Sequence, residues 1–136
     1  MNDMKPSTPS GILAFAALVE ILTGLALLID ARLVIAWLAG VLIADAGTLL
    51  GPFLGIALLA LGLACWPERR QADSVTPAFR AMLMYSVMIA LYLAYLGIGW
   101  QWAGPLLWPA VVLHAVVALL LLWTWRGSFH PKEDSR

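Results

Sequence analysis

The sequence predicts an all-α integral membrane protein: a four-helix bundle with a short interfacial helix between the first and second spans. The first observation is composition, because 62% of the 136 residues are hydrophobic and only 12% are charged. Soluble domains are about 45–50% apolar and about 25% charged. The second observation is that the apolar residues form long uninterrupted runs, so lipid is the expected solvent. A chain of this length predicts one domain.

Four apolar runs are long enough to cross a bilayer, and they cover about residues 11–29, 48–66, 78–100 and 104–125. A run of about 19 residues makes a helix of roughly 28 Å, close to the ~30 Å thickness of the hydrocarbon layer. Helices are expected because lipid cannot satisfy free backbone groups. Polar tails at residues 1–10 and 126–136 flank these runs.

A fifth apolar segment, Leu33–Ala44, is only about 12 residues long and has Asp30, Arg32 and Asp45 at its ends. As a helix it would reach roughly 18 Å, which is too short to cross. We therefore expect a short helix at the membrane face, with Trp37 at headgroup level. A five-span chain is the alternative.

The basic residues predict the orientation of the chain. With four spans and the N-terminus inside, Arg32 is the one basic residue of eight that lies outside. This is a strong positive-inside signal, so both termini are expected in the cytoplasm of a bacterial inner membrane. Five spans with the N-terminus outside would leave Lys5 as the one exception, so segment length and not charge favours four. The zero net charge argues against a nucleic-acid partner.

Glycines in the second run indicate a helix-packing face. Gly51, Gly55 and Gly62 share one stripe, which is interrupted by the larger Leu58. Small residues spaced in this way let helix backbones approach closely in lipid. The stripe predicts packing within the bundle, with a homodimer face or a groove for a partner helix as the alternative.

Glu20 and His114 are the candidate functional pair. Each lies near the middle of its run, so both are expected near the bilayer midplane, where an unpaired charge is costly. We predict that the two side chains lie within hydrogen-bonding reach. Thr23 shares the stripe of Glu20, and three tyrosines in the third run could extend a polar network: Tyr85, Tyr92 and Tyr95. A structural hydrogen bond and a proton or ligand site both remain open.

Other chemistry has little support in the sequence. Cys65 is the only cysteine, so no intramolecular disulfide can form. A metal site needs three or four ligands, whereas Glu20 and His114 offer two. His130 lies in the tail, so a haem held by two membrane histidines is not expected. We therefore predict no catalytic residues, no metal and no cofactor.

Several motifs are familiar as a set: Glu20-Ile-Leu-Thr-Gly-Leu-Ala-Leu-Leu28, Leu61-Gly-Leu-Ala-Cys-Trp66, Ala81-Met-Leu-Met-Tyr85 and Leu106-Leu-Trp-Pro-Ala-Val-Val-Leu-His-Ala115. Together they resemble a group of small uncharacterised bacterial membrane proteins with a DoxX-like arrangement. The resemblance covers roughly residues 11–125 and implies four spans with a short apolar helix after the first. DoxX itself is linked to thiosulfate:quinone oxidation as a membrane subunit, but no residue here would carry that chemistry.

The expected function is non-enzymatic. The chain is predicted to be an accessory or structural subunit that packs against a larger membrane complex or against itself. The first alternative is a proton-coupled carrier, or a binder of a lipophilic ligand such as a quinone or lipid, that works through Glu20, His114 and the tyrosines. The second is a DoxX-like subunit of a quinone-linked redox system.

Overall fold

The protein is all-α in the part of the chain that the computed structural model describes, namely residues 9–40, 45–67, 76–99 and 104–127. Side chains are described from residue 10 onward, apart from those of residues 45–49 and 127. The four helices are α1 (Pro9–Ala39), α2 (Asp45–Ala64), α3 (Pro77–Gly99) and α4 (Leu107–Gly127). The predicted helical fold class is therefore confirmed.

Helix α1 contains two helical segments joined by a kink at Asp30, where φ is −150° and ψ is 86°. The Asp30 carboxylate accepts a hydrogen bond from the backbone N–H of Leu33 at 3.0 Å, so it caps the second segment. That segment is the short helix predicted at 33–44. It ends earlier than expected, because Gly40 has a φ of 72° and terminates the helix at Ala39. Residues 41–44 lie outside the described residues.

The other helix boundaries differ from the predicted ones by a few residues. Helix α2 begins three residues earlier than residue 48. Helix α4 begins three residues later than residue 104, because the N–H of Leu107 closes a turn onto the carbonyl of Gly104 at 3.1 Å. Helix α3 begins within one residue of its predicted start, where Thr76 Oγ1 accepts a hydrogen bond from the N–H of Phe79 at 3.2 Å.

Three helical stretches are long and apolar enough to cross a membrane: Ser10–Ala39, Pro77–Gly99 and Leu107–Arg126. The apolar stretch described for α2, Leu50–Ala64, is shorter than these three. Length and composition therefore support three of the four predicted spans directly.

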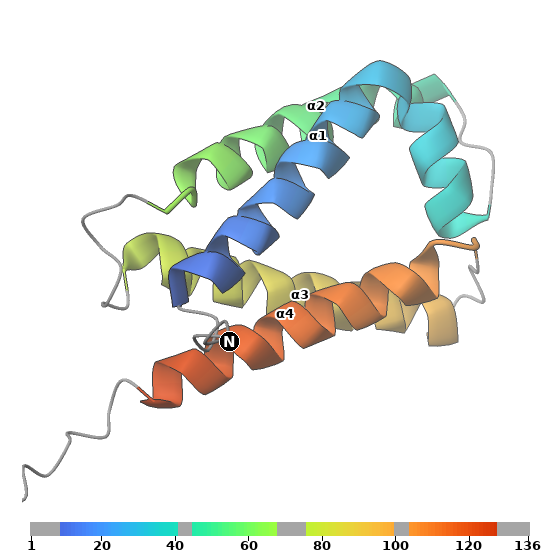
Figure 1. The fold of residues 1–136 in the computed structure, drawn as a ribbon. Helices are drawn as coiled ribbons and strands as arrows, with labels where there is room; N and C mark the ends of the chain where they lie inside the picture. The colour runs from blue at the N-terminus through green and yellow to red at the C-terminus, as the bar shows by residue number, and fades with distance from the viewer. Residues whose placement is uncertain (1–8, 41–44, 68–75, 100–103, 128–136) are drawn as a thin grey trace, which may run out of the picture.

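The helices form two hairpins (Figure 1). Hairpin 1 consists of α1 and α2, and hairpin 2 consists of α3 and α4. Within each hairpin the two helices lie side by side, whereas α1 makes most of the contacts between the hairpins. Consequently α1 is the element that holds the two hairpins together.

The glycine stripe of α2 packs on α1. Gly51, Gly55 and Gly62 are all buried. A Cβ atom added to Gly55 would lie 2.8 Å from the carbonyl oxygen of Gly24, and one added to Gly62 would lie 2.7 Å from that of Ala17. Only hydrogen fits at these positions, so the two backbones approach as closely as the small-residue spacing predicts.

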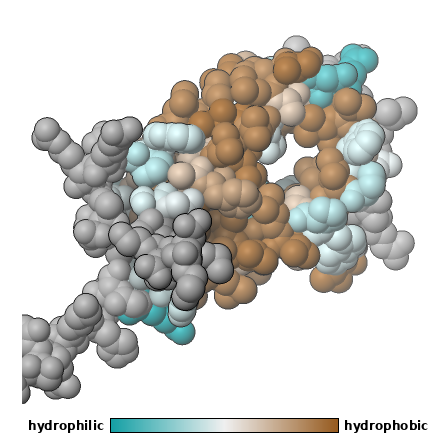
Figure 2. Space-filling model, viewed as in Figure 1, coloured by the Kyte–Doolittle hydropathy of each residue, from teal (hydrophilic) through white to brown (hydrophobic). Residues whose placement is uncertain are grey.

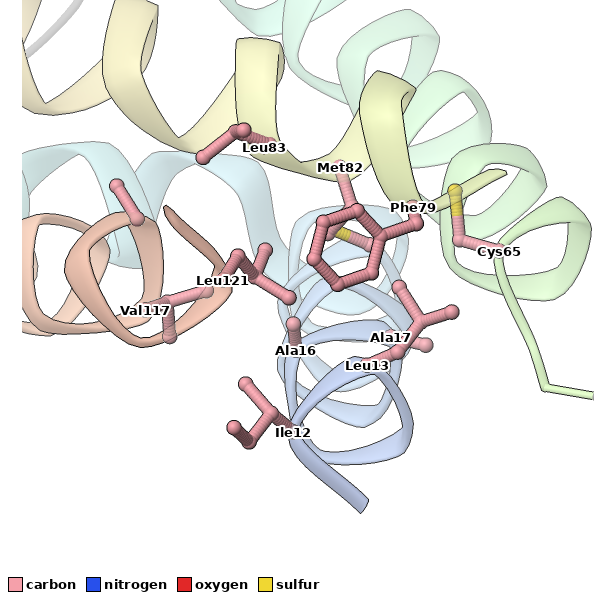
Figure 3. Packing of buried hydrophobic residues seen from close by; sticks show 11 residues of the cluster. Ile12, Leu13, Ala16, Ala17, Cys65, Phe79, Met82, Leu83, Val117 and Leu121 are labelled. Atoms are coloured by element: carbon pink, nitrogen blue, oxygen red, sulfur yellow. The ribbon is translucent and has the colours of Figure 1, made fainter. Parts of the chain in front are cut away.

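The hairpins meet in an apolar cluster (Figure 3). Its buried residues come from α1, α3 and α4 and include Cys65. Met82 of α3, Leu121 of α4 and Ala17 of α1 are all fully buried in it. Cys65, directly after α2, belongs to the same cluster, and its Sγ lies 3.5 Å from the carbonyl of Ala78. This cluster fixes one end of the bundle.

At the opposite end the hairpins diverge, and the second segment of α1 crosses between them (Figure 1). The backbone N–H of Leu106 donates to the carbonyl of Trp37 at 2.9 Å. A Cβ atom on Gly104 would collide with the backbone of Trp37 and Leu38. Figure 2 shows openings in the surface between the diverging hairpins. The short helix therefore ties hairpin 1 to the turn of hairpin 2 at the end where the helices separate.

Candidate functional site

Glu20 is the only charged side chain that is buried among the described residues, with 3% of its surface exposed. It follows Ala16 and Ala17 on the α1 face that meets hairpin 2. Helical spacing of 3–4 residues places all three on one stripe. Helix α1 therefore places the carboxyl group of Glu20 at the contact between the two hairpins.

Both carboxyl oxygens of Glu20 have partners on hairpin 2. The hydroxyl of Tyr85 in α3 donates to Oε2 at 3.0 Å. The Nε2 atom of His114 in α4 lies 3.3 Å from Oε1. The predicted contact between Glu20 and His114 is therefore present, and one side chain of α1 connects to both helices of hairpin 2.

His114 is oriented by its own helix. Its Nδ1 atom lies 2.8 Å from the carbonyl oxygen of Ala110, one turn earlier in α4. The ring also meets Tyr85 edge to face, with 6.0 Å between ring centroids and an interplanar angle of 66°. These two contacts leave the opposite ring nitrogen, Nε2, directed at Glu20.

The other predicted network residues do not join this site. Thr23 makes no hydrogen bond with Glu20, Tyr85 or His114, whose polar contacts go to one another and to Ala110. Tyr92 and Tyr95 are more than half exposed on α3. Tyr92 follows Tyr85 by seven residues on the same face of α3, yet its side chain is exposed whereas that of Tyr85 is partly buried. The extension of the network through Tyr92 and Tyr95 therefore stays a prediction.

The buried polar groups of the site are all hydrogen-bonded within the protein. No buried side-chain nitrogen or oxygen among the described residues lacks a hydrogen-bond partner. The described residues also contain no group of three histidine, cysteine or acidic side chains that could hold a metal ion. Each strong donor or acceptor of the site is already used internally, which is the arrangement of a structural polar network.

One participant was missed at the sequence level, namely the backbone carbonyl of Ala110. The signal was available, because a histidine inside a helix can reach the carbonyl four residues earlier. This carbonyl determines which nitrogen of His114 carries a hydrogen, so it belongs to the site as much as the side chains do.

No protein-family model, no curated protein and no solved structure matches this chain. The DoxX-like arrangement therefore stays a prediction from the motifs alone.

Proposed function

We propose that this chain is a non-enzymatic integral protein of the bacterial inner membrane, an accessory or structural subunit that packs against a larger membrane complex or against copies of itself. The observation that carries the proposal is a reversal of the usual soluble pattern. The one buried charged group among the described residues is matched by internal partners, whereas large apolar side chains cover the outside of all four helices.

The exterior supports the membrane part of the proposal. Figure 2 shows an apolar band across the middle of the molecule, with more polar residues toward its ends. The exposed large apolar side chains include Leu22, Phe53, Met88 and Leu119, one from each helix. Contiguous apolar surface of this extent is not stable in water and indicates lipid or protein contact.

The proposed topology has four spans, with residues 1–10 and 126–136 in the cytoplasm. The exposed tryptophans fit this layout: Trp66 and Trp123 lie toward one face of the membrane and Trp108 toward the other. Tryptophan favours the two membrane–water interfaces. The short second segment of α1 then lies at the outer face, where it contacts the turn between α3 and α4.

We expect reporters fused to either end of the chain to read as cytoplasmic, because the positive-inside rule places seven of the eight basic residues inside. Paired reporters, one active only in the cytoplasm and one only outside it, make the measurement. A reporter on the loop between α3 and α4 is the control and should read as external. An external reading for the N-terminal fusion would favour five spans instead.

The subunit role is supported by helix faces that no other described residue covers. On α3 the exposed residues Met84, Met88 and Leu91 follow one another at spacings of four and three, which is the pattern of a face that packs on another helix. At the polar site, by contrast, every buried side-chain nitrogen and oxygen among the described residues already has a partner within the chain.

Purification in mild detergent tests the subunit role. We expect the chain to migrate as a stable assembly larger than a monomer, with itself or with other membrane proteins, and Met88→Lys on the outer face of α3 should break it. Val112→Lys, on an exposed position of α4, is the matched control. A monodisperse wild-type monomer that moves protons or a lipophilic solute in vesicles would favour the carrier alternative. In that case Glu20→Gln should abolish the activity without unfolding the chain.

A further inference from the structure

We propose that Glu20 and His114 form a proton-binding site, in which the fold holds one proton between Glu20 Oε1 and His114 Nε2 at neutral pH. With this proton in place the pair carries no net charge. The assignment goes beyond the packing role proposed above. It does not depend on that role, because it follows from which atoms face one another in the site.

The carbonyl of Ala110 fixes the first hydrogen on the histidine ring. A carbonyl oxygen can only accept, so at 2.8 Å the Nδ1 atom of His114 must donate to it. A neutral imidazole carries one hydrogen, and here that hydrogen is on Nδ1. The Nε2 atom of a neutral His114 would therefore be a bare acceptor.

That bare nitrogen would face a second acceptor. Nε2 lies 3.3 Å from Oε1 of Glu20, and an ionised carboxylate has no hydrogen to give. Two lone pairs would then oppose each other at the contact between the hairpins. The other oxygen, Oε2, already accepts from the hydroxyl of Tyr85, so rotating the carboxyl group does not remove the conflict. One additional proton between Oε1 and Nε2 turns the contact into a hydrogen bond.

Within the described part of the chain, no other charged group neutralises Glu20. From α3, the Tyr85 hydroxyl faces it as a neutral donor. The described arginines are all exposed, namely Arg32, Arg80 and Arg126. The contact between Glu20 and His114 is the one ion pair among the described residues. An isolated buried carboxylate is strongly disfavoured.

The proton can occupy either side of the contact. On Oε1 it gives a carboxylic acid that donates to a neutral ring, and on Nε2 it gives an imidazolium that donates to a carboxylate. The proton belongs to the pair and not to either residue, as in other strongly coupled sites. Both arrangements keep the link between α1 and α4, and loss of the proton breaks it.

The ring of His114 can be observed directly. His130→Gln leaves His114 as the only histidine of the two in the chain, so ¹⁵N labelling of histidine gives one pair of ring signals. In mild detergent at neutral pH we expect a protonated Nδ1. We also expect either a protonated Nε2, or a bare Nε2 together with an infrared band of a protonated carboxyl group that Glu20→Gln removes. A hydrogen on Nε2 alone, or a neutral ring with no protonated carboxyl group, overturns the proposal.

The pH dependence of folding gives a second readout, with Glu20→Gln as the matched control. Glutamine offers an N–H to Nε2 and a carbonyl to Tyr85 without needing an extra proton. Above about pH 7 the unfolded wild-type chain holds no such proton, because glutamate is ionised and histidine is neutral there. The wild-type folding constant should therefore fall about tenfold per pH unit relative to the variant. Parallel pH profiles would contradict the proposal. The ring spectra test it even if the variant does not fold.

Discussion

Glu20→Leu is expected to destabilise the bundle by about 1–3 kcal/mol, the cost of leaving buried polar partners unmatched. Leucine removes the acceptor of the Tyr85 hydroxyl and the partner of His114 Nε2 in one step. Among the described residues, the Tyr85 hydroxyl and the Nε2 atom of His114 have no hydrogen-bond partner other than Glu20 to compensate. Thermal unfolding or denaturant titration in detergent measures the loss.

The double substitution Glu20→Leu with His114→Leu should recover part of that loss, because it removes the unmatched ring nitrogen together with the carboxyl group. Recovery should be incomplete, since the Tyr85 hydroxyl still lacks its acceptor. Glu20→Gln is the control and should cost little, because it keeps the size and both polar contacts. If the two leucine substitutions were simply additive, the coupling between Glu20 and His114 would be absent.

The sequence was sufficient to predict helices and their approximate ends. Long apolar runs determine where a helix can span, and charged residues interrupt them. Asp30 is an example: it ends the first apolar run, and in the structure it marks the kink and caps the next segment. The second segment of α1 ends at Ala39, earlier than the helix predicted at 33–44, because Gly40 lies inside the apolar segment and adopts a positive φ there. Periodicity alone does not reveal a helix terminus of this kind.

Contacts between helices were predictable only where a polar side chain would be costly to leave unpaired in the membrane. Glu20 and His114 are costly when unpaired, so similar depth in two spans was enough to predict their contact. Tyr92 shows the limit of the same reasoning. Its spacing from Tyr85 places both on one face of α3, but a face does not specify how far the neighbouring helix continues along it. Tyr85 is partly buried against Glu20, whereas Tyr92 is exposed.

The tie between the short helix and hairpin 2 was not predicted. It depends on backbone atoms, namely the carbonyl of Trp37 and the N–H of Leu106, and backbone groups leave no pattern in the sequence. Gly104 could have suggested it, because a glycine directly before a proline turn often allows close backbone approach. The close approach itself depends on the fold, in which a Cβ atom at this position would collide with the backbone of Trp37 and Leu38.

The α1–α2 contact should be the least tolerant surface of the bundle to added volume. A Cβ atom on Gly55 alone would lie 2.8 Å from the carbonyl oxygen of Gly24 and 3.1 Å from the Cβ atom of Leu27. The first of these neighbours is helix backbone, which cannot move without shifting α1 along its length. Gly55→Leu adds three further carbon atoms in the same direction, so the helices must separate to admit it.

We expect Gly55→Leu to lower the free energy of unfolding by 1–3 kcal/mol or more, the usual range for overpacking, with a shift in detergent unfolding temperature as the measurement. Ala60→Leu is the matched control, because Ala60 is exposed on the opposite side of α2 and surrounding lipid or detergent can accommodate the same added volume. It should leave stability nearly unchanged. Equal stability of the two variants would show that α1 and α2 do not pack through the glycine stripe. A loss confined to Gly55→Leu would show that the backbone approach at Gly24 holds hairpin 1 together, and so positions Glu20 for its partners on hairpin 2.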